Sequence, residues 1–248
     1  VGSDYVFPRT ANAILRDRIA SKGGEVVGEV YLPLGSQDVA AAVRAIAQSR
    51  PDVILNTING DSNVAFFRRL RAAGVSSEDT PTMSFSVAEE ELRTLGGGAM
   101  VGDYAAWSYF QSVDSPRNES FVKAFRDLYG AHRVVDDPME AAYFGVHLWA
   151  QAVAEAGTPE VGAVRAAIRH QRFDAPEGLI QIDPDNGHTH KWVRIGKIRA
   201  DGQFDVVWRS DAPVKPQPYP ASRSRQDWER LLDDLYRGWG GQWAAPGA

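Results

Sequence analysis

The stretch PDVILNTINGDSNVAFFRRLRAAG, residues Pro51–Gly74, decides the fold class of this chain. Its short apolar run Val53–Leu55 is typical of a strand that is buried on both faces of a parallel sheet. The polar loop Asn59–Asp61 follows it, and the apolar residues after the loop recur at helical spacing until Gly74, which suits the end of a helix. The stretch therefore predicts a strand, a loop and a helix in succession.

The same unit occurs upstream. A helix is predicted to begin near Pro8 and to stop at Gly23-Gly24, because proline is favoured at helix starts and glycine just beyond helix ends. A strand is predicted over Glu25–Tyr31. The next helix has its apolar residues on one face between Val39 and Ile46.

The unit also recurs downstream. Pro81–Phe85 is predicted to be a strand, and Ser86–Glu89 fits a capping box, in which a serine is followed three residues later by a glutamate. The helix after it is predicted to end at Gly96-Gly97-Gly98. Strand, loop, helix and strand at this spacing predict βαβ units and hence an α/β fold with a parallel, doubly wound sheet.

The pattern changes after residue 104. An aromatic strand within Tyr104–Phe110 is followed by three helices without intervening strands. The first begins at Ser115-Pro116, the second opens with a further capping box at Asp137–Glu140, and the third covers Val161–His170.

The last part of the chain is predicted to start with antiparallel strands. Asp201-Gly202 is a strong hairpin signal, and Phe204, Val206 and Trp208 alternate with other residues after it. Four prolines then predict an extended connector: Pro213, Pro216, Pro218 and Pro220. An amphipathic helix closes the chain, with its apolar face formed by Trp228, Leu231, Leu232, Leu235 and Trp239.

Composition excludes several classes of function. The net charge of −5 over 248 residues gives no basic footprint for nucleic acid, and no apolar run approaches the roughly 20 residues of a membrane-spanning helix. The absence of cysteine excludes disulfides, thiolate metal sites and cysteine nucleophiles. His188 and His190 have no evident third ligand for a metal, and the glycines at Gly96–Gly98 do not form a phosphate loop. With no Gly-x-Ser-x-Gly motif either, we expect neither an enzyme nor a bound cofactor or metal.

The loops after the strands that end at Tyr5, Thr57 and Phe85 should meet at one edge of the sheet. In open α/β sheets, ligands bind outside the carboxyl ends of the strands. This places seven residues in a candidate ligand site: Tyr5, Phe7, Asn59, Gly60, Asp61, Ser86 and Glu89. The alternative is that Asn59 and Asp61 only cap a helix and that Ser86 and Glu89 only form the capping box.

Five stretches together resemble one family: Val1–Arg9, Tyr31–Gly35, Asn59–Asp61, Tyr109-Phe110 and Ala175–Gly178. They resemble the urea and short-chain amide branch of type 1 periplasmic binding proteins, and the similarity covers nearly the whole chain. The resemblance implies a two-lobed α/β fold with doubly wound parallel sheets, of which the first lobe is incomplete here. Residues 1–105 would form the main part of the second lobe, and residues 106–175 the returning part of the first. Residues 176–210 would rejoin the second lobe as strands and a β-hairpin, and residues 211–248 would form the connector and the last helix.

The same resemblance implies a function. We expect a solute-binding component of an ABC transporter that holds urea or a short-chain aliphatic amide between two lobes, with the permease as its partner and homodimerisation left open. The alternatives are a branched-chain amino-acid binder of the same fold and a cytoplasmic amide sensor. Phe7 stands where the sensors have a tyrosine, and the Asn59–Asp61 loop is more polar than theirs. The expected location is periplasmic or extracytoplasmic, with a targeting segment upstream of Val1, or cytoplasmic for a sensor.

Overall fold

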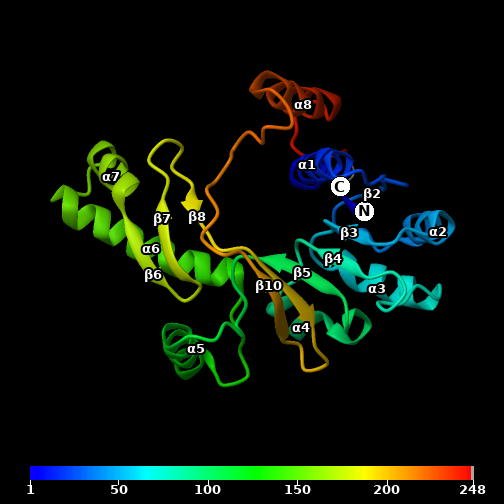
Figure 1. The fold of residues 1–248 in the computed structure, drawn as a ribbon, viewed down its shortest axis with the longest axis horizontal. Coiled ribbons are helices and arrows are strands. Elements are labelled where there is room, and N and C mark those ends of the chain that lie inside the picture. Colours follow the sequence, from blue (N-terminus) through cyan, green and yellow to red (C-terminus); the bar gives the residue numbers. More distant parts are fainter. Residues whose placement is uncertain (247–248) are drawn as a thin grey trace. The chain divides into compact units, whose positions relative to one another are not determined.

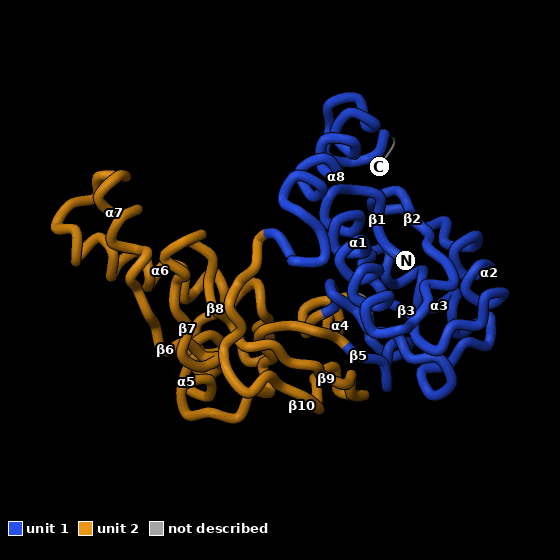
Figure 2. The backbone as a smooth tube through the Cα atoms, turned by 45° about the horizontal axis from the view of Figure 1, so that its top comes forward, with its two compact units in different colours: residues 1–87, 95–104, 219–248 blue, residues 88–94, 105–218 orange. Residues whose placement is uncertain are grey.

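The computed structural model of the protein describes residues 1–246, which divide into two compact units. Unit 1 contains residues 1–87, 95–104 and 219–248, and unit 2 contains residues 88–94 and 105–218 (Figure 2). Among the described helices, none combines the length and the hydropathy that a membrane crossing requires.

Unit 1 is built on four parallel strands. Their bounds are β1 (Gly2–Ser3), β2 (Tyr31–Leu32), β3 (Ile54–Asn56) and β4 (Thr82–Ser84). β1 pairs in parallel with β2, and Gly2 forms a parallel bridge with Thr57 at the end of β3. β3 pairs in parallel with β4, so the strands lie in the order β2-β1-β3-β4. The predicted parallel α/β arrangement is confirmed.

Helices connect and cover these strands. They are α1 (Val6–Ser21), α2 (Ala40–Ser49), α3 (Ser62–Ala72), the short 3-10 helix η1 (Gly97–Met100) and the C-terminal α8 (Arg225–Gly238). α2 packs beside α3, and α1 packs beside α8 (Figure 1). α3 contributes Phe66, Phe67 and Leu70 to the core, all fully buried. The helical periodicity of Pro51–Gly74 therefore identified the buried face of α3.

The predicted strand over Glu25–Tyr31 is wrong except at its last residue. Residues 25–30 form no strand ladder, and β2 begins only at Tyr31. A strand needs a hydrogen-bonded neighbour. The neighbouring strand is β1, which begins at Gly2 and pairs with the chain from Tyr31 onward. The Gly2 N–H donates to the Val30 carbonyl at 3.0 Å, and residues 25–29 have no hydrogen-bond partner on β1 in the described structure.

Unit 2 contains the predicted succession of helices, followed by antiparallel strands. The helices are α4 (Glu89–Leu95, of which residues 89–94 belong to this unit), α5 (Pro116–Tyr129), α6 (Asp137–Ala156), α7 (Val161–Ala167) and the 3-10 helix η2 (Ile168–His170). The strands are β5 (Tyr104–Trp107, of which residues 105–107 belong to this unit), β6 (Arg172–Ala175), β7 (Gly178–Ile182), β8 (Thr189–His190), β9 (Arg194–Ile198) and β10 (Phe204–Arg209). β6, β7 and β8 form an antiparallel sheet, and α6 packs on it through Phe144 and Leu148.

The hairpin signal at Asp201-Gly202 is confirmed, because β9 and β10 pair antiparallel on either side of it. Gly202 has a φ of +76°, which glycine adopts without the strain that other residues incur. The expected alternation along β10 is wrong beyond Phe204, since Val206 and Trp208 are both exposed. The register shifts between these two residues, and a bulge of this kind interrupts the regular alternation of faces.

Candidate functional site

The strand order of unit 1 places its switch point between β1 and β3. The chain leaves β1 toward β2 on one side and returns across the sheet to β3 and β4 on the other. Ligands of open α/β sheets bind outside the carboxyl ends of the strands at such a reversal. The segments that leave β1 and β3 there are residues 4–7 and 57–61, which carry five of the seven predicted site residues.

Direct hydrogen bonds join the end of β1 to the segment that leaves β3. The Asn59 N–H donates to Ser3 Oγ at 3.0 Å, and the Ser3 N–H donates to the Thr57 carbonyl at 3.4 Å. Ser86, which follows β4, donates from its hydroxyl to the carbonyl of Ile58. Tyr5, Asn59 and Ser86 therefore lie at the ends of three adjacent strands, as the parallel pattern predicted.

The loop after β3 presents backbone donors. Gly60 has a φ of +67°, a left-handed conformation that favours glycine, and the loop turns there into α3. Asn63 and Val64 donate their N–H groups to the Gly60 and Asp61 carbonyls, whereas the N–H groups of Gly60, Asp61 and Ser62 have no partner among the described residues. Helix N-termini of this kind are ready sites for an acceptor atom.

Asp61 lies at the N-cap position of α3 but does not cap it. Its side chain accepts no helix N–H and is exposed. Asn59 donates its side-chain N–H to the Thr57 carbonyl at 3.1 Å, so it also does not cap α3. The alternative that these two residues merely cap a helix is therefore wrong.

A buried polar network supports the loop and was not predicted. The Asn56 side chain donates to Asn63 Oδ1 at 2.9 Å and to Ser84 Oγ at 3.0 Å, and its Oδ1 accepts the Ile58 N–H at 3.0 Å. Asn63 in turn donates to the Ile58 carbonyl at 2.9 Å and to the Gly60 carbonyl at 3.2 Å. Asparagine is unusual inside a buried strand, and this was the available signal in the sequence. These side chains fix the backbone from Ile58 to Gly60.

Tyr5 and Phe7 give the edge an aromatic part. Their ring centroids lie 6.2 Å apart, and Phe7 is 41% exposed. Partial burial raises the pKa of the Tyr5 hydroxyl, which keeps it a neutral group that can both donate and accept. The nearby Arg9 pairs with Asp4 at 2.8 Å and stacks over the Tyr31 ring at 3.6 Å, so its charge is already engaged.

Glu89 belongs to unit 2, whereas the other predicted site residues belong to unit 1. It is fully buried, and its Oε1 accepts the Gln111 N–H at 2.7 Å, while Oε2 has no hydrogen-bond partner in the described structure. Burial raises the pKa of Glu89 to about 8. The predicted capping box is wrong, because Glu91 rather than Glu89 reaches back, to the Ala88 N–H at 2.9 Å.

The second predicted capping box, Asp137–Glu140, is also wrong, because the N-cap residue is Asp136 and Glu140 accepts the Glu177 N–H instead. Asp136, one residue earlier than expected, caps α6 by accepting the Met139 N–H at 3.1 Å. Asp137 instead accepts the backbone N–H groups of Ser108 and Tyr109, both at 2.9 Å. The box therefore does not form at the predicted position.

Glu140 is buried in a cluster with other charged side chains of unit 2. Glu177 donates its N–H to Glu140 Oε1 at 3.3 Å, and Lys191 Nζ lies 3.3 Å from Glu177 Oε1 and 3.5 Å from Asp137 Oδ1. Burial raises the pKa of Glu140 to about 8 and that of Glu177 to about 7, with the neighbouring carboxyl groups acting in the same direction. One lysine thus faces three carboxyl groups, two of which hold protons more tightly than usual.

His190, one of the two histidines considered as metal ligands, is paired with a carboxylate. His190 Nε2 lies 3.1 Å from Asp183 Oδ2, a pairing that accounts for its position beside the β7–β8 turn. Across the described part of the chain, no group of three or more His, Asp or Glu side chains is arranged to hold a metal ion.

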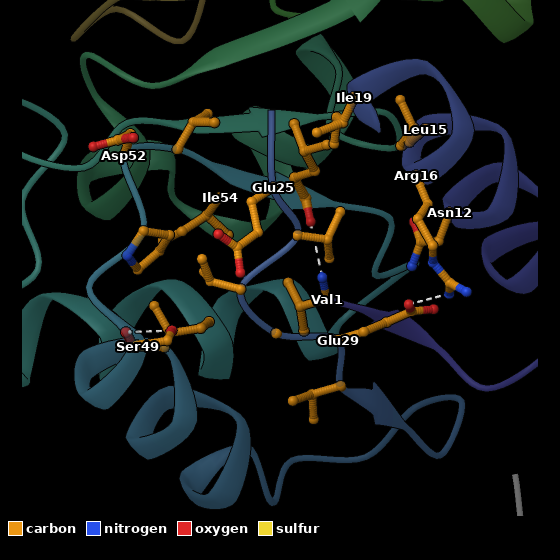
Figure 3. Close-up of a pocket in the computed structure, with 18 of the residues that line it drawn as sticks. Val1, Asn12, Leu15, Arg16, Ile19, Glu25, Glu29, Ser49, Asp52 and Ile54 are labelled. Carbon is orange, nitrogen blue, oxygen red and sulfur yellow. Dashed lines mark hydrogen bonds and ion pairs between the residues drawn. The ribbon is translucent and has the colours of Figure 1, made fainter. Parts of the chain in front are cut away.

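A cavity of about 420 Å³ lies at the opposite, amino end of the unit 1 strands (Figure 3). Its walls come from α1, α2, the start of β3 and residues 24–30, with Leu15, Ile46 and Val53 among the apolar lining. The main chain of residues 25–29 has no hydrogen-bond partner in the described structure. The cavity contains none of the predicted site residues, so it is separate from the edge at the switch point.

The fold is that of type 1 periplasmic binding proteins, a mixed α/β fold with parallel strands. The chain matches the periplasmic binding protein domain over residues 1–225, and it belongs to that family.

Two curated relatives and one solved structure show how far the similarity reaches. Leu/Ile/Val-binding protein homolog 6 of Brucella melitensis is 26% identical over 202 residues, covering 80% of this chain and 52% of that protein. Limonene hydroxylase of Geobacillus stearothermophilus is 29% identical over 147 residues, covering 57% of this chain and 27% of that protein. The chain thus spans about half of the first relative and about a quarter of the second.

The structure is similar to the solute binding protein of an ABC transporter from Rhodopseudomonas palustris HaA2, solved in complex with p-hydroxybenzoic acid. The TM-score is 0.77 at 24% identity, covering 89% of this chain and 61% of that one. At this identity the likeness shows the fold.

Proposed function

We propose that the protein is the solute-binding component of an ABC transporter and works outside the cytoplasm. Membership of the periplasmic binding protein family supports this, as does the fold it shares with a transporter's solute binding protein. The proposed role is reversible binding rather than catalysis. The solute would be held at the carboxyl edge of unit 1, by Tyr5, Asn59, Asp61 and Ser86.

The proposed ligand is urea or a short-chain aliphatic amide. An amide offers one C=O acceptor and an NH₂ donor, and the edge offers both complements. The unpaired N–H groups at the start of α3 suit the C=O, and the exposed Asp61 carboxylate suits the NH₂. One observation carries the proposal: Arg9, which follows the segment that contains Tyr5, is already paired with Asp4. A ligand carboxylate would therefore meet the Asp61 charge without Arg9 being free to balance it.

A branched-chain amino acid is the second candidate. The Brucella relative is named a Leu/Ile/Val-binding protein, and its match covers most of this chain. The unpaired N–H groups at the α3 N-terminus are also the groups that bind carboxylates in other proteins. The two candidates differ in charge: an amino acid carries a carboxylate that the Asp61 carboxylate would repel, whereas urea and amides are neutral.

A panel of ligands separates these candidates. We expect urea, formamide or acetamide to raise the melting temperature of the intact protein, with an effect that grows with concentration as RT ln(1 + [L]/Kd). Leucine, valine and 4-hydroxybenzoate should leave it unchanged. The measurement is a thermal shift series in a constant buffer. Stabilisation by leucine with no response to urea or any small amide would replace the first candidate by the second.

The Asp61→Ala substitution should weaken binding without weakening the fold. Asp61 is exposed and caps nothing, so we expect a change of unfolding free energy within about 0.5 kcal/mol. Loss of an acceptor for the ligand NH₂ should cost about 1–3 kcal/mol of binding. The matched control is Asp52→Ala, which removes the same charge from the opposite end of β3. Calorimetry that gives both variants the affinity of the parent would exclude Asp61 from the site.

A further inference from the structure

The C-terminal helix of unit 1 is firmly attached beside α1. Asp17 accepts two hydrogen bonds from the Arg223 guanidinium, both at 2.8 Å, and a third from the Ser222 hydroxyl at 2.9 Å. Trp228 is buried, and its indole N–H donates to the Pro220 carbonyl at 2.8 Å. α8 therefore starts from a fixed position on the same unit as the candidate site.

The chain reverses direction after α8. Gly240 and Gly241 have φ values of +66° and +82°, and the Gly241 N–H donates to the Tyr236 carbonyl at 2.8 Å. Two consecutive left-handed residues end the helix as a glycine-rich C-cap does. The Trp243 ring then lies 4.7 Å from the Tyr236 ring, which holds the returning segment against the helix it has just left.

The returning segment pairs with the residues that carry Tyr5. Ala244 forms an antiparallel bridge with Tyr5. On either side of this bridge, the Val6 N–H donates to the Trp243 carbonyl at 2.9 Å, and the Ala245 N–H donates to the Asp4 carbonyl at 3.0 Å.

Tyr5 needs such support because α1 does not provide it. Tyr5 is the N-cap residue of α1, with extended backbone and no side-chain capping bond. Val6 is the first helical residue, and its N–H is one of the donors that a helix leaves unpaired. The Trp243 carbonyl supplies the missing acceptor, so the two hydrogen bonds fix the backbone on both sides of Tyr5.

We propose that Trp243–Ala245 form a clasp that positions Tyr5 for the ligand, so that the C-terminal segment is part of the binding apparatus without touching the solute. The proposal rests on the proposed function, because it assigns Tyr5 to the site. A side chain that is ordered before the ligand arrives does not have to be immobilised on binding, and affinity gains by that difference. The clasp is thus a positioning element.

Two truncations test the clasp. Removal of residues 243–248 deletes both hydrogen bonds, whereas removal of residues 246–248 keeps Trp243–Ala245 and serves as the matched control. The Trp243→Ala variant keeps the backbone donors and acceptors but loses the contact with Tyr236. Two quantities are measured for each protein: amide hydrogen exchange at Val6, and the affinity for urea, acetamide, leucine and 4-hydroxybenzoate by calorimetry.

We expect the longer truncation to speed exchange at Val6 at least tenfold, since its acceptor is removed, and to weaken binding of the recognised probe about tenfold. The shorter truncation should change neither, and Trp243→Ala should give an intermediate result. Unchanged exchange at Val6 in the longer truncation would overturn the clasp. Faster exchange with undiminished affinity would overturn its positioning role. If the intact protein binds none of the four probes, the proposed ligand classes fail, and the exchange measurement still decides whether the clasp holds this backbone.

Discussion

The Glu140→Gln variant should be more stable than the parent at pH 8 and should depend less on pH between 5 and 8. Glu140 has a pKa of about 8 in the folded protein, against an ordinary value of 4.5, because it is buried among other carboxyl groups. Between these two values the folded state holds a proton that the unfolded state has released. The contribution of Glu140 to stability is therefore fully present below pH 4.5 and is lost as pH rises toward 8.

The expected gain from Glu140→Gln at pH 8 is on the order of 2–4 kcal/mol, because glutamine cannot ionise and its side-chain oxygen can still accept the Glu177 N–H. Urea unfolding at pH 5, 6.5 and 8 measures the effect. Glu119→Gln, an exposed glutamate on α5, is the matched control and should leave the pH profile unchanged. A Glu140→Gln profile parallel to that of the parent would contradict the expectation. Glu177 shares the cluster, so its substitution should not be additive with that of Glu140.

The parallel fold of unit 1 could be predicted because its signals are local. The apolar run before Asn59 and the glycine after α3 are read directly from the chain, and parallel strands bring their carboxyl ends to one edge. The pattern alone was therefore enough to predict that Tyr5, Asn59 and Ser86 lie at this edge, although it does not show the hydrogen bonds made there.

Glu89 and Glu140 could not be predicted in the same way. Each lies three residues after a serine or an aspartate. This spacing is compatible with an exposed capping box and equally with a buried glutamate that accepts a hydrogen bond from elsewhere in the chain. The choice is made by distant residues, since Gln111 supplies the N–H for Glu89 and Glu177 supplies it for Glu140. A backbone N–H donor that belongs to a distant segment cannot be predicted from the residues next to its acceptor.

The strand over residues 25–30 failed for a related reason. Its three valines, Val26, Val27 and Val30, carry the propensity for a strand. A strand also requires hydrogen-bonded partners, and here the ladder with β1 starts at Tyr31. The C-terminal clasp is likewise invisible in the sequence, because its pairing joins residues at opposite ends of the chain.

The Asn63→Ala variant should lower the unfolding free energy by about 2–4 kcal/mol, because it breaks three hydrogen bonds at once, two of them buried and one partly buried. The Ile58 and Gly60 carbonyls would each lose one of two donors, because the Ser86 hydroxyl and the Asn63 backbone N–H still reach them. The Asn56 side chain would lose one of its two acceptors.

Ser62→Ala is the matched control for this variant. Ser62 is the residue before Asn63 on α3, it is equally buried, and its hydroxyl has no hydrogen-bond partner in the described structure. We expect a change within about 0.5 kcal/mol, since no bond is broken and alanine favours the helix. Urea unfolding with an unchanged m-value measures both variants. Equal losses for the two would mean that filled volume, rather than the polar network, supports this turn. A large loss for Asn63→Ala alone would show that the Asn56–Asn63 pair holds the backbone between Ile58 and Gly60, and with it the N–H groups that the proposed ligand would use.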